Sequence, residues 1–474
     1  MRTRIEHGTL ICHRGGRVDV LEDHTIEIAG GTIAGVYPGD TSKRQNADTP
    51  ESRQYDTNTT QKDGESGDVR VIEASRHIIL PGLVNTHHHL YQSLTRGLKS
   101  VQDAPLFDWL TALYARWRHL DFTSVRAAAQ ISIAELQLSG CTTTSDHFYV
   151  FPRGSDVRIE AVLEAAESMG MRIHACRGSM SVGVSAGGLP PDDCTQSEDA
   201  ILVDCTRVLD RFHDPAPLAM RRIDLAPCSP FSVSPELLRE TAALARERGA
   251  LLHTHAAETL DEQRYCIERF GVRPIELLDR AGWLGTDVYL AHCVHLDASD
   301  IRRLAETRTG VAHCPCSNMR LGSGIPPVRA LLDAGARVGL GVDGSSSNDG
   351  GHLLAEARQA LLLQRVTGGA GALSVAEAFT LATLGGAAVL NRPLLGNIER
   401  GCAADLAMYR RDDIALAGAV EQDPLGAMTL CHVHRADRVI INGKTVVEDG
   451  RITTIDLPEL IVRFNRLVGN EFRE

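Results

Sequence analysis

The stretch His77–His89, HIILPGLVNTHHH, joins a run of apolar residues to three consecutive histidines. Seven further short runs, rich in β-forming or small residues, recur along the chain and also carry polar side chains at their ends. They are GCTTTSDHFY (140–149), RIHACRG (172–178), IDLAPCSPF (223–231), LLHTHAAE (251–258), VYLAHCVH (288–295), VAHCPCSN (311–318) and VGLGVDGS (338–345). Segments with helical periodicity separate the runs. Eight strands that alternate with helices predict an α/β fold, a parallel sheet closed into a (β/α)8 barrel of the TIM type.

The segments between the runs contain the start and stop signals of helices. In SPELLRETAALARERG, Ser234 is a suitable N-cap, Pro235 suits the first helical position, and Gly249 is placed to end the helix. Ser374 and Glu377 have the spacing of a capping box before another apolar segment. These signals support helices between the predicted strands.

Shorter β-like runs flank the predicted barrel at both ends of the chain. Such runs alternate with glycine turns near the start, and the same rhythm returns after residue 395. We therefore expect 1–76 and 395–474 to pair into a small composite β-sandwich domain, with the catalytic barrel over 77–394. Residues 38–68 carry almost no hydrophobic side chain, and we expect them to form a flexible surface insertion without a catalytic part.

The composition is that of an ordinary globular protein, with 43% hydrophobic and 23% charged residues among 474. A formal charge of −12 argues against nucleic acid or an anionic membrane as the main partner. No apolar run reaches the ~18 residues that span a bilayer, and the start, MRTRIEHGTL, lacks the apolar core of a secretory signal. We therefore expect a cytoplasmic protein. The 12 cysteines are scattered singly, which favours free structural thiols over disulfides.

The histidines that end the first run have the spacing of metal ligands. Side chains two residues apart on a strand share a face, so His87 and His89 can both point into the mouth of the barrel while His88 faces the other way. Two imidazoles on one face form half of a zinc site. Alone, the pattern also fits a surface run of histidines.

Three other runs end in groups of the same kind. The fifth run supplies His253 and His255, with Glu258 three residues after the second histidine. The sixth run contains His292 and the eighth contains Asp343. Any one of them is more often a satisfied polar residue near a core. The C-terminal ends of barrel strands form the active-site face, however, so the whole set in barrel order predicts a metal centre.

This order of motifs, H-x-H, then H-x-x-E, then A-H, then V-D-G, resembles the amidohydrolase superfamily, in particular its cytosine deaminase-like and chlorohydrolase-like branch. The flanking β segments resemble the composite small domain of that branch. The metal ligands that the resemblance implies are His87, His89, His255 and Asp343. It also implies that Glu258 is the proton shuttle and that His292 touches the attacking water or the substrate. His253 is the competing ligand on the fifth strand, but only His255 stands in H-x-x-E spacing to Glu258.

One divalent ion per chain is expected. Members of the superfamily with two metals need a carbamylated lysine, usually on the fourth strand, and here no lysine lies between Lys99 and Lys444. Zinc is the expected metal because the site is rich in histidine, with iron(II) as the alternative. Such an ion lowers the pKa of its water from about 16 to about 7. The resulting hydroxide, oriented by His292 and Asp343, would attack an amidine-type carbon while Glu258 relays the proton.

Several segments resemble the 8-oxoguanine deaminase group, which implies hydrolysis of 8-oxoguanine to urate and ammonia. They are NTHHHLYQSLTRGL (85–98), LFDWLTALYARW (106–117), RGSMSVGVSAGGLPPDD (177–193), LAPCSPFSV (225–233), SNMRLGSGIPPV (317–328) and VDGSSSND (342–349). Related groups act on isoxanthopterin, on chlorinated or hydroxylated triazines and on other aminoheterocycles, and these remain alternative functions. A non-catalytic, zinc-stabilised scaffold is a remote alternative, because such proteins usually lose the proton shuttle first. Lookalike enzymes are commonly dimers or larger, so we expect a homo-oligomer.

Three residues are candidates for substrate contacts. Gln92 follows the H-x-H motif, and its carboxamide suits the lactam edge of an oxopurine, or else braces the loop. Arg177 and His147 end strands at the same face, and either contacts the substrate or pairs with a neighbouring carboxylate. The aromatic residues of 109–117 recur at helical spacing, which favours core packing over stacking on a substrate.

Overall fold

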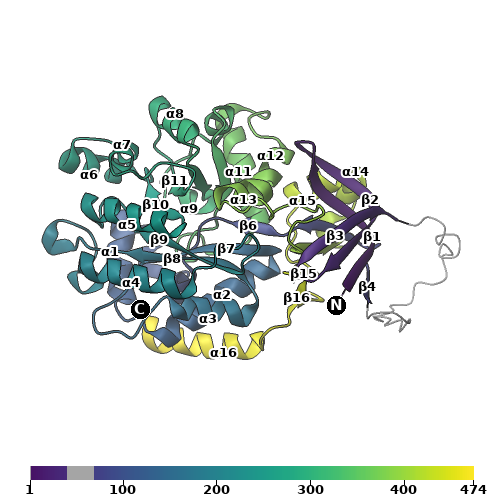
Figure 1. Cartoon of the computed structure of the whole chain (residues 1–474), viewed down its shortest axis with the longest axis horizontal. Helices are drawn as coiled ribbons and strands as arrows, with labels where there is room; N and C mark the ends of the chain where they lie inside the picture. The colour runs from purple at the N-terminus through teal and green to yellow at the C-terminus, as the bar shows by residue number, and fades with distance from the viewer. Residues whose placement is uncertain (1, 40–68, 474) are drawn as a thin grey trace.

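The computed structural model describes residues 2–39 and 69–473 (Figure 1). Eight strands form one sheet in the order β13-β12-β11-β10-β9-β8-β7-β6, and every described pairing in it is parallel. The strands are β6 (Leu83–Asn85), β7 (Cys141–Phe148), β8 (Arg172–Ser179), β9 (Arg221–Pro227), β10 (Leu252–Ala256), β11 (Val288–His292), β12 (Gly310–His313) and β13 (Arg337–Leu340). The Thr86 N–H donates to the Leu340 carbonyl over 2.8 Å, which joins the last strand to the first. The predicted (β/α)8 barrel is confirmed.

Helices surround the barrel strands and are bounded as the sequence signals indicate. The Ser234 side chain accepts from the Leu237 N–H, Pro235 begins the helix, and Gly249 ends it with φ 65°. The capping box of Ser374 and Glu377 is also present. The helices are α1 (Leu106–Trp117), α2 (Phe122–Leu138), α3 (Glu160–Met169), α4 (Glu198–Phe212), α5 (Pro235–Arg248), α6 (Leu260–Phe270), α7 (Pro274–Arg280), α8 (Ala298–Thr307), α9 (Pro315–Arg320), α10 (Val328–Asp333), α11 (Leu353–Gly368), α12 (Val375–Thr380), α13 (Gly386–Val389), α14 (Ala419–Gln422), α15 (Pro424–Leu430) and α16 (Leu457–Leu467).

A second sheet gathers strands from both ends of the chain and lies beside the barrel (Figure 1). It is a single nine-stranded sheet in the order β17-β16-β15-β14-β5-β1-β2-β3, with β4 paired to β1. Its strands are β1 (Arg2–Arg14), β2 (Arg17–Ala29), β3 (Thr32–Pro38), β4 (Val69–Glu73), β5 (His77–Pro81), β14 (Leu406–Arg410), β15 (Arg438–Ile441), β16 (Lys444–Glu448) and β17 (Arg451–Ile452). The two chain ends thus meet in one continuous sheet, with β5 between β1 and β14.

The run that opens the barrel is divided between the two sheets. His77–Pro81 belongs to the nine-stranded sheet, whereas Leu83–Asn85 is the first barrel strand. At the other end of the chain, helix α16 packs against α2 of the barrel. The division into 1–76 with 395–474 and 77–394 stays a prediction, and nearly all of the predicted insertion 38–68 lies outside the described residues.

A buried ion pair connects the bottom of the barrel with the second sheet. Arg172, at the start of β8, reaches Asp405 just before β14 with two hydrogen bonds of 2.9 and 3.1 Å. Both side chains are almost completely buried.

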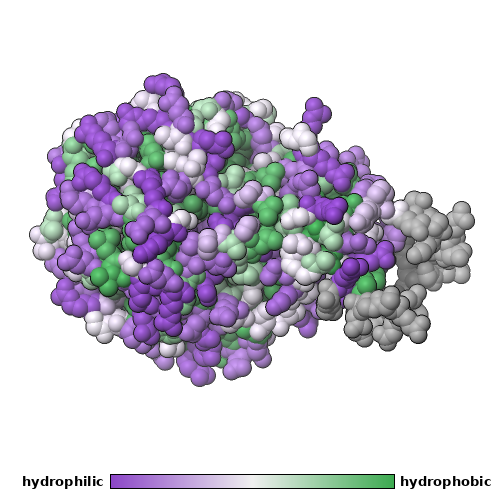
Figure 2. Space-filling view, viewed as in Figure 1, coloured by the Kyte–Doolittle hydropathy of each residue, from purple (hydrophilic) through white to green (hydrophobic). Residues whose placement is uncertain are grey.

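The face shown in Figure 2 is largely hydrophilic, with the hydrophobic residues in small groups. Among the helices of residues 2–39 and 69–473, none combines the length and apolar character needed to cross a bilayer.

Candidate metal centre and active site

The hydrogen bonds around His87 fix which of its ring nitrogens carries the proton. His253 Nδ1 lies 2.9 Å from the Tyr289 carbonyl oxygen, which can only accept, so His253 is protonated on Nδ1 and its Nε2 is an acceptor. His87 Nδ1 therefore donates to His253 Nε2 over 2.7 Å. The His87 Nε2 lone pair is left buried without a hydrogen-bond partner, 3.4 Å from Asp343 Oδ1. An unpartnered buried acceptor of this kind is a ready metal ligand.

His89 and His255 are held in the same tautomer by backbone carbonyls. His89 Nδ1 donates to the His147 carbonyl over 2.6 Å, and His255 Nδ1 donates to the Cys228 carbonyl over 2.5 Å. Their unprotonated Nε2 atoms then face each other at 3.1 Å. Two lone pairs at this distance repel unless a cation lies between them. Burial is the largest effect on both rings: it lowers the pKa of His89, and it lowers that of His255 to about 3.

Asp343 completes this group from the opposite side of the barrel closure. Its Oδ1 lies 3.4 Å from Nε2 of both His87 and His89. Its Oδ2 accepts from Ser317 Oγ and Ser347 Oγ at 2.5 and 3.1 Å. Burial alone raises the pKa of Asp343, but the nearby histidines, His87 first, outweigh it and hold the pKa well below its usual value. Three imidazole nitrogens and one carboxylate oxygen fit a divalent ion such as zinc.

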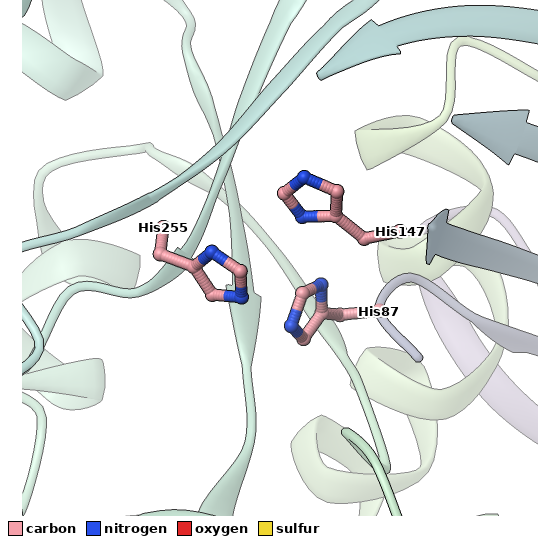
Figure 3. A group of neighbouring side chains, drawn as sticks. All are labelled: His87, His147 and His255. Carbon is pink, nitrogen blue, oxygen red and sulfur yellow. The ribbon is translucent and has the colours of Figure 1, made fainter. Parts of the chain in front are cut away.

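A further histidine approaches the same point from β7. Ring nitrogens of His87, His147 and His255 lie within 4.8 Å of one another (Figure 3). His147 Nε2 donates to the Ala226 carbonyl over 2.8 Å, which leaves its buried Nδ1 without a partner. Its ring stacks on that of His255, with centroids 4.7 Å apart. A second group of possible ligands consists of His87, His292 and Asp343, so the histidines and the carboxylate form one continuous cluster.

Glu258 and His292 stand side by side next to this cluster. Glu258 Oε2 lies 3.7 Å from His292 Nε2, and Glu258 Oε1 accepts from Ser323 Oγ at 3.3 Å. His292 Nδ1 donates to Asn318 Oδ1 over 2.9 Å, which leaves Nε2 facing the carboxylate. Burial raises the pKa of Glu258. Burial lowers the pKa of His292, but the carboxylates of Glu258 and Asp343 outweigh this effect and raise it. A carboxyl group with a raised pKa beside an open cavity is suited to take up and return a proton.

These groups form the floor of a cavity with apolar walls. The floor contains His89, Gln92, His255, Glu258, His292 and Asp343. The walls include Leu106, Trp109, Leu110, Tyr149, Phe231 and Leu321. Aromatic and aliphatic walls around a few convergent polar groups are typical of a site for a small, flat ligand.

The amidohydrolase family model matches residues 78–446. The chain belongs to the amidohydrolase family. It is 48% identical to the 8-oxoguanine deaminase of Pseudomonas aeruginosa over 391 residues, 82% of this chain and 87% of the relative. It is 40% identical to an isoxanthopterin deaminase of an unknown prokaryotic organism over 424 residues, 85% of this chain and 88% of the relative. The zinc complex of the atrazine chlorohydrolase of Arthrobacter aurescens TC1 superposes with a TM-score of 0.88 at 32% identity, over 98% of this chain and 100% of that one.

Most of the predicted site residues of this amidohydrolase lie together. His87, His89, His255 and Asp343 surround one point, and Glu258 and His292 border it. His253, the competing ligand, lies behind His87 and is occupied on both ring nitrogens. Gln92 lines the cavity, and its Oε1 accepts weakly from the Ser346 N–H at 3.4 Å.

Arg177 and His147 do not line the cavity of the amidohydrolase. Arg177 Nε donates to Asp204 Oδ2 over 2.7 Å, Nη2 donates to Gln196, and the guanidinium lies over the Phe151 ring at 4.0 Å. These contacts give no support to a role of Arg177 in substrate binding. His147 lies within the cluster of histidines, where its position suits a metal ligand better than a substrate contact.

Several wall residues have no signal of their own in the sequence. Leu106, Trp109 and Leu110 come from α1, whose helical spacing indicates core packing, although Trp109 faces the cavity. Phe231 follows β9, and Tyr149 follows β7, both in the loops that leave the C-terminal ends of barrel strands. That position was the one available signal for the last two residues.

Proposed function

We propose that this amidohydrolase is a metal-dependent hydrolytic deaminase that converts 8-oxoguanine to urate and ammonia with one zinc ion per chain. Water adds to the 2-amino carbon, the C–N bond breaks, and the amino group leaves as ammonia. The observation that carries the proposal is the placement of Glu258. Its carboxyl group lies at the floor of an apolar-walled cavity, 3.7 Å from His292 Nε2 and beside the cluster of metal ligands.

The ligand set proposed for the ion is His87, His89, His255 and Asp343. Three of the four groups are neutral, so the ion would keep most of its positive charge. A divalent ion held there would lower the pKa of a water molecule from about 16 to about 7. The hydrogen bonds on the far side of each ring fix the ring nitrogens in place before any ion arrives.

Glu258 and His292 handle the proton and the orientation of the reactants. The Glu258 carboxylate would accept a proton from the attacking water and deliver it to the ring nitrogen or to the departing amine. The hydrogen bond to Asn318 holds His292 with Nε2 facing Glu258, and from there Nε2 would contact the attacking water or the substrate. Such a relay typically contributes about 10²–10⁴-fold to the rate.

The substrate is proposed from the cavity and from the relatives together. The 48% identity to an enzyme named 8-oxoguanine deaminase exceeds the 40% identity to the isoxanthopterin deaminase, although both share most of their length with this chain. The aromatic and aliphatic walls suit an apolar ring system such as a bicyclic heterocycle. The Gln92 carboxamide can both donate to and accept from a lactam edge. A homo-oligomer and a cytoplasmic location stay predictions.

The test is ammonia release by the zinc-loaded protein against 8-oxoguanine, isoxanthopterin, guanine, cytosine and S-adenosylhomocysteine. We expect turnover of 8-oxoguanine to urate. The ultraviolet absorbance of urate monitors the formation of this product. Ammonia from another compound alone would keep the mechanism and replace the substrate. Chloride release from a chlorotriazine without ammonia from any of the five would favour dechlorination.

The Glu258→Gln variant tests the proton relay in the same assay. We expect turnover to be nearly abolished, by about 10²–10⁴-fold, while metal analysis still finds one zinc ion per chain. Full activity in this variant would contradict the assignment. Iron in place of zinc in the active protein would change only the identity of the metal.

A further inference from the structure

Glu262 is a buried carboxylate next to the active site that the proposed reaction does not use. It lies in the first turn of α6 and is 1% exposed. Its Oε1 accepts from the Ala257 N–H over 2.8 Å, and its Oε2 accepts from the Glu258 N–H over 2.7 Å. Both carboxylate oxygens of Glu262 therefore accept from consecutive peptide N–H groups. One of these is the N–H of Glu258, the proposed proton shuttle.

Those peptide groups belong to a turn that the backbone does not favour by itself. Ala257 has φ 53°, in the left-handed region that a residue with a Cβ rarely adopts. The Ala257 carbonyl is held from the other side, where it accepts from the N–H groups of Val294 and His295 at 2.9 and 2.8 Å. Glu262 is itself fixed, because its N–H donates to Thr259 Oγ1, the N-cap of α6, over 3.3 Å.

The turn decides where the Glu258 side chain points. Glu262 accepts from the N–H of Glu258 itself, and the Glu258 carboxyl group lies 3.7 Å from His292 Nε2. The only side-chain hydrogen bond to the Glu258 carboxyl group within the described residues is the 3.3 Å contact from Ser323 Oγ. A shuttle must swing between a water and a leaving group, so a loosely held carboxyl group has to be placed by its backbone.

We propose that Glu262 is a positioning residue that fixes the backbone of Glu258 and thereby aims the proton shuttle at the reacting atoms. The proposal rests on the proposed function, since it assigns Glu262 no contact with substrate or metal. The carboxyl group of Glu262 offers a separate oxygen to each of the two N–H donors. A glutamine at 262 would accept from one peptide group and turn its own N–H₂ toward the other donor.

The first test compares Glu262→Gln with Glu268→Gln, which makes the same substitution on the exposed face of the same helix. The assay uses whichever heterocycle the wild-type protein deaminates. For Glu262→Gln we expect kcat to fall about 10–100-fold, with KM changed less than about threefold and zinc content unchanged. For Glu268→Gln we expect wild-type kinetics. Loss of zinc in proportion to loss of activity would overturn the proposal, since the role would then be that of a metal-site brace.

The second test combines Glu262→Gln with Glu258→Gln in one chain. If Glu262 acts only through Glu258, adding Glu262→Gln to Glu258→Gln lowers the residual kcat by less than about twofold, because coupled residues are not additive. An equal fold loss in both backgrounds would show a general structural role and overturn the proposal. Full activity of Glu258→Gln alone would instead refute the proposed shuttle. If Glu262→Gln does not fold, Glu262→Asp, which withdraws the carboxylate by one methylene, takes its place in both tests with the same two outcomes.

Discussion

At the scale of single residues, the metal centre depends on which ring nitrogens of its histidines carry no proton. Each of His87, His89 and His255 donates from Nδ1 to a fixed acceptor and presents a bare Nε2. Two of these acceptors are backbone carbonyls, which substitution cannot remove. The third is the side chain of His253, so the tautomer of His87 depends on one replaceable residue.

Replacing His253 tests this dependence directly. In His253→Leu the Nδ1–H of His87 loses its acceptor, and we expect zinc affinity to fall about 10–100-fold. In His253→Gln the carboxamide offers an acceptor to His87 and a donor to the Tyr289 carbonyl, so we expect a smaller loss. Competition with a chromogenic chelator measures both affinities. Wild-type affinity in the leucine variant would show that His253 has no part in holding the ligand.

At the scale of elements, one short helix serves both halves of the site. Helix α9 supplies Ser317 to the Asp343 carboxylate and Asn318 to Nδ1 of His292. Its first turn is held in place by Glu356, a buried carboxylate on α11 that accepts from the Cys316 N–H over 3.1 Å. The consecutive residues Ser317 and Asn318 therefore contact the Asp343 carboxylate, a proposed metal ligand, and the ring of His292.

The Asn318→Ala variant separates these two roles. It removes the acceptor of the His292 ring and leaves the bond from Ser317 to Asp343 intact, so we expect kcat to fall about 10–100-fold with zinc content unchanged. Met319→Ala, at an exposed neighbour on the same helix, should behave as the wild type. Steady-state ammonia release and metal analysis provide both readouts. Equal kinetics of the two variants would exclude an orienting role for Asn318.

The sequence predicts the barrel well because eight short runs, rich in β-forming or small residues, alternate with helical segments and carry polar groups at their ends. It does not show that HIILPGLVNTHHH splits at Pro81–Gly82, since the apolar run is continuous across the split and nothing local marks a change of sheet. Spacing predicts that His87 and His89 share a face, whereas the prediction for Asp343 rests on its place at the end of the eighth run and on the family resemblance. The sequence does not predict where the Arg177 side chain points, because that depends on Asp204 and Gln196, which come from a later helix and loop. Trp109 was equally ambiguous, since one helical face can cover a core or a cavity.

At the scale of the whole molecule, the two sheets are connected by buried charges as well as by apolar packing. The guanidinium of Arg172 meets the carboxylate of Asp405 in two hydrogen bonds, and Asp405 Oδ1 also accepts from the Asn442 N–H over 2.7 Å. This carboxylate thus joins Arg172 of the barrel to the turn between β15 and β16 of the second sheet. Removing one partner would leave an uncompensated charge in a dry interior.

Asp405→Asn is therefore expected to be costly for the whole fold. We expect the free energy of unfolding to fall by about 3–5 kcal/mol, the usual effect of breaking a buried ion pair. Asp210→Asn removes an exposed partner of Arg248 and should cost no more than about 1 kcal/mol. Reversible urea unfolding followed by circular dichroism measures both values. Equal stability of the two variants would show that the buried pair does not join the two sheets energetically.

The closure of the barrel between β6 and β13 has a consequence for how the protein is made. The ribosome releases His87 and His89 early, but Asp343 and the strand that completes the ring emerge only after six intervening strands. A nascent chain exposes its first two imidazoles long before the carboxylate that accompanies them exists. If His87, His89, His255 and Asp343 hold the ion as proposed, a chain has the full ligand set only once translation has passed the eighth strand, and a prematurely terminated product carries the histidines without the carboxylate.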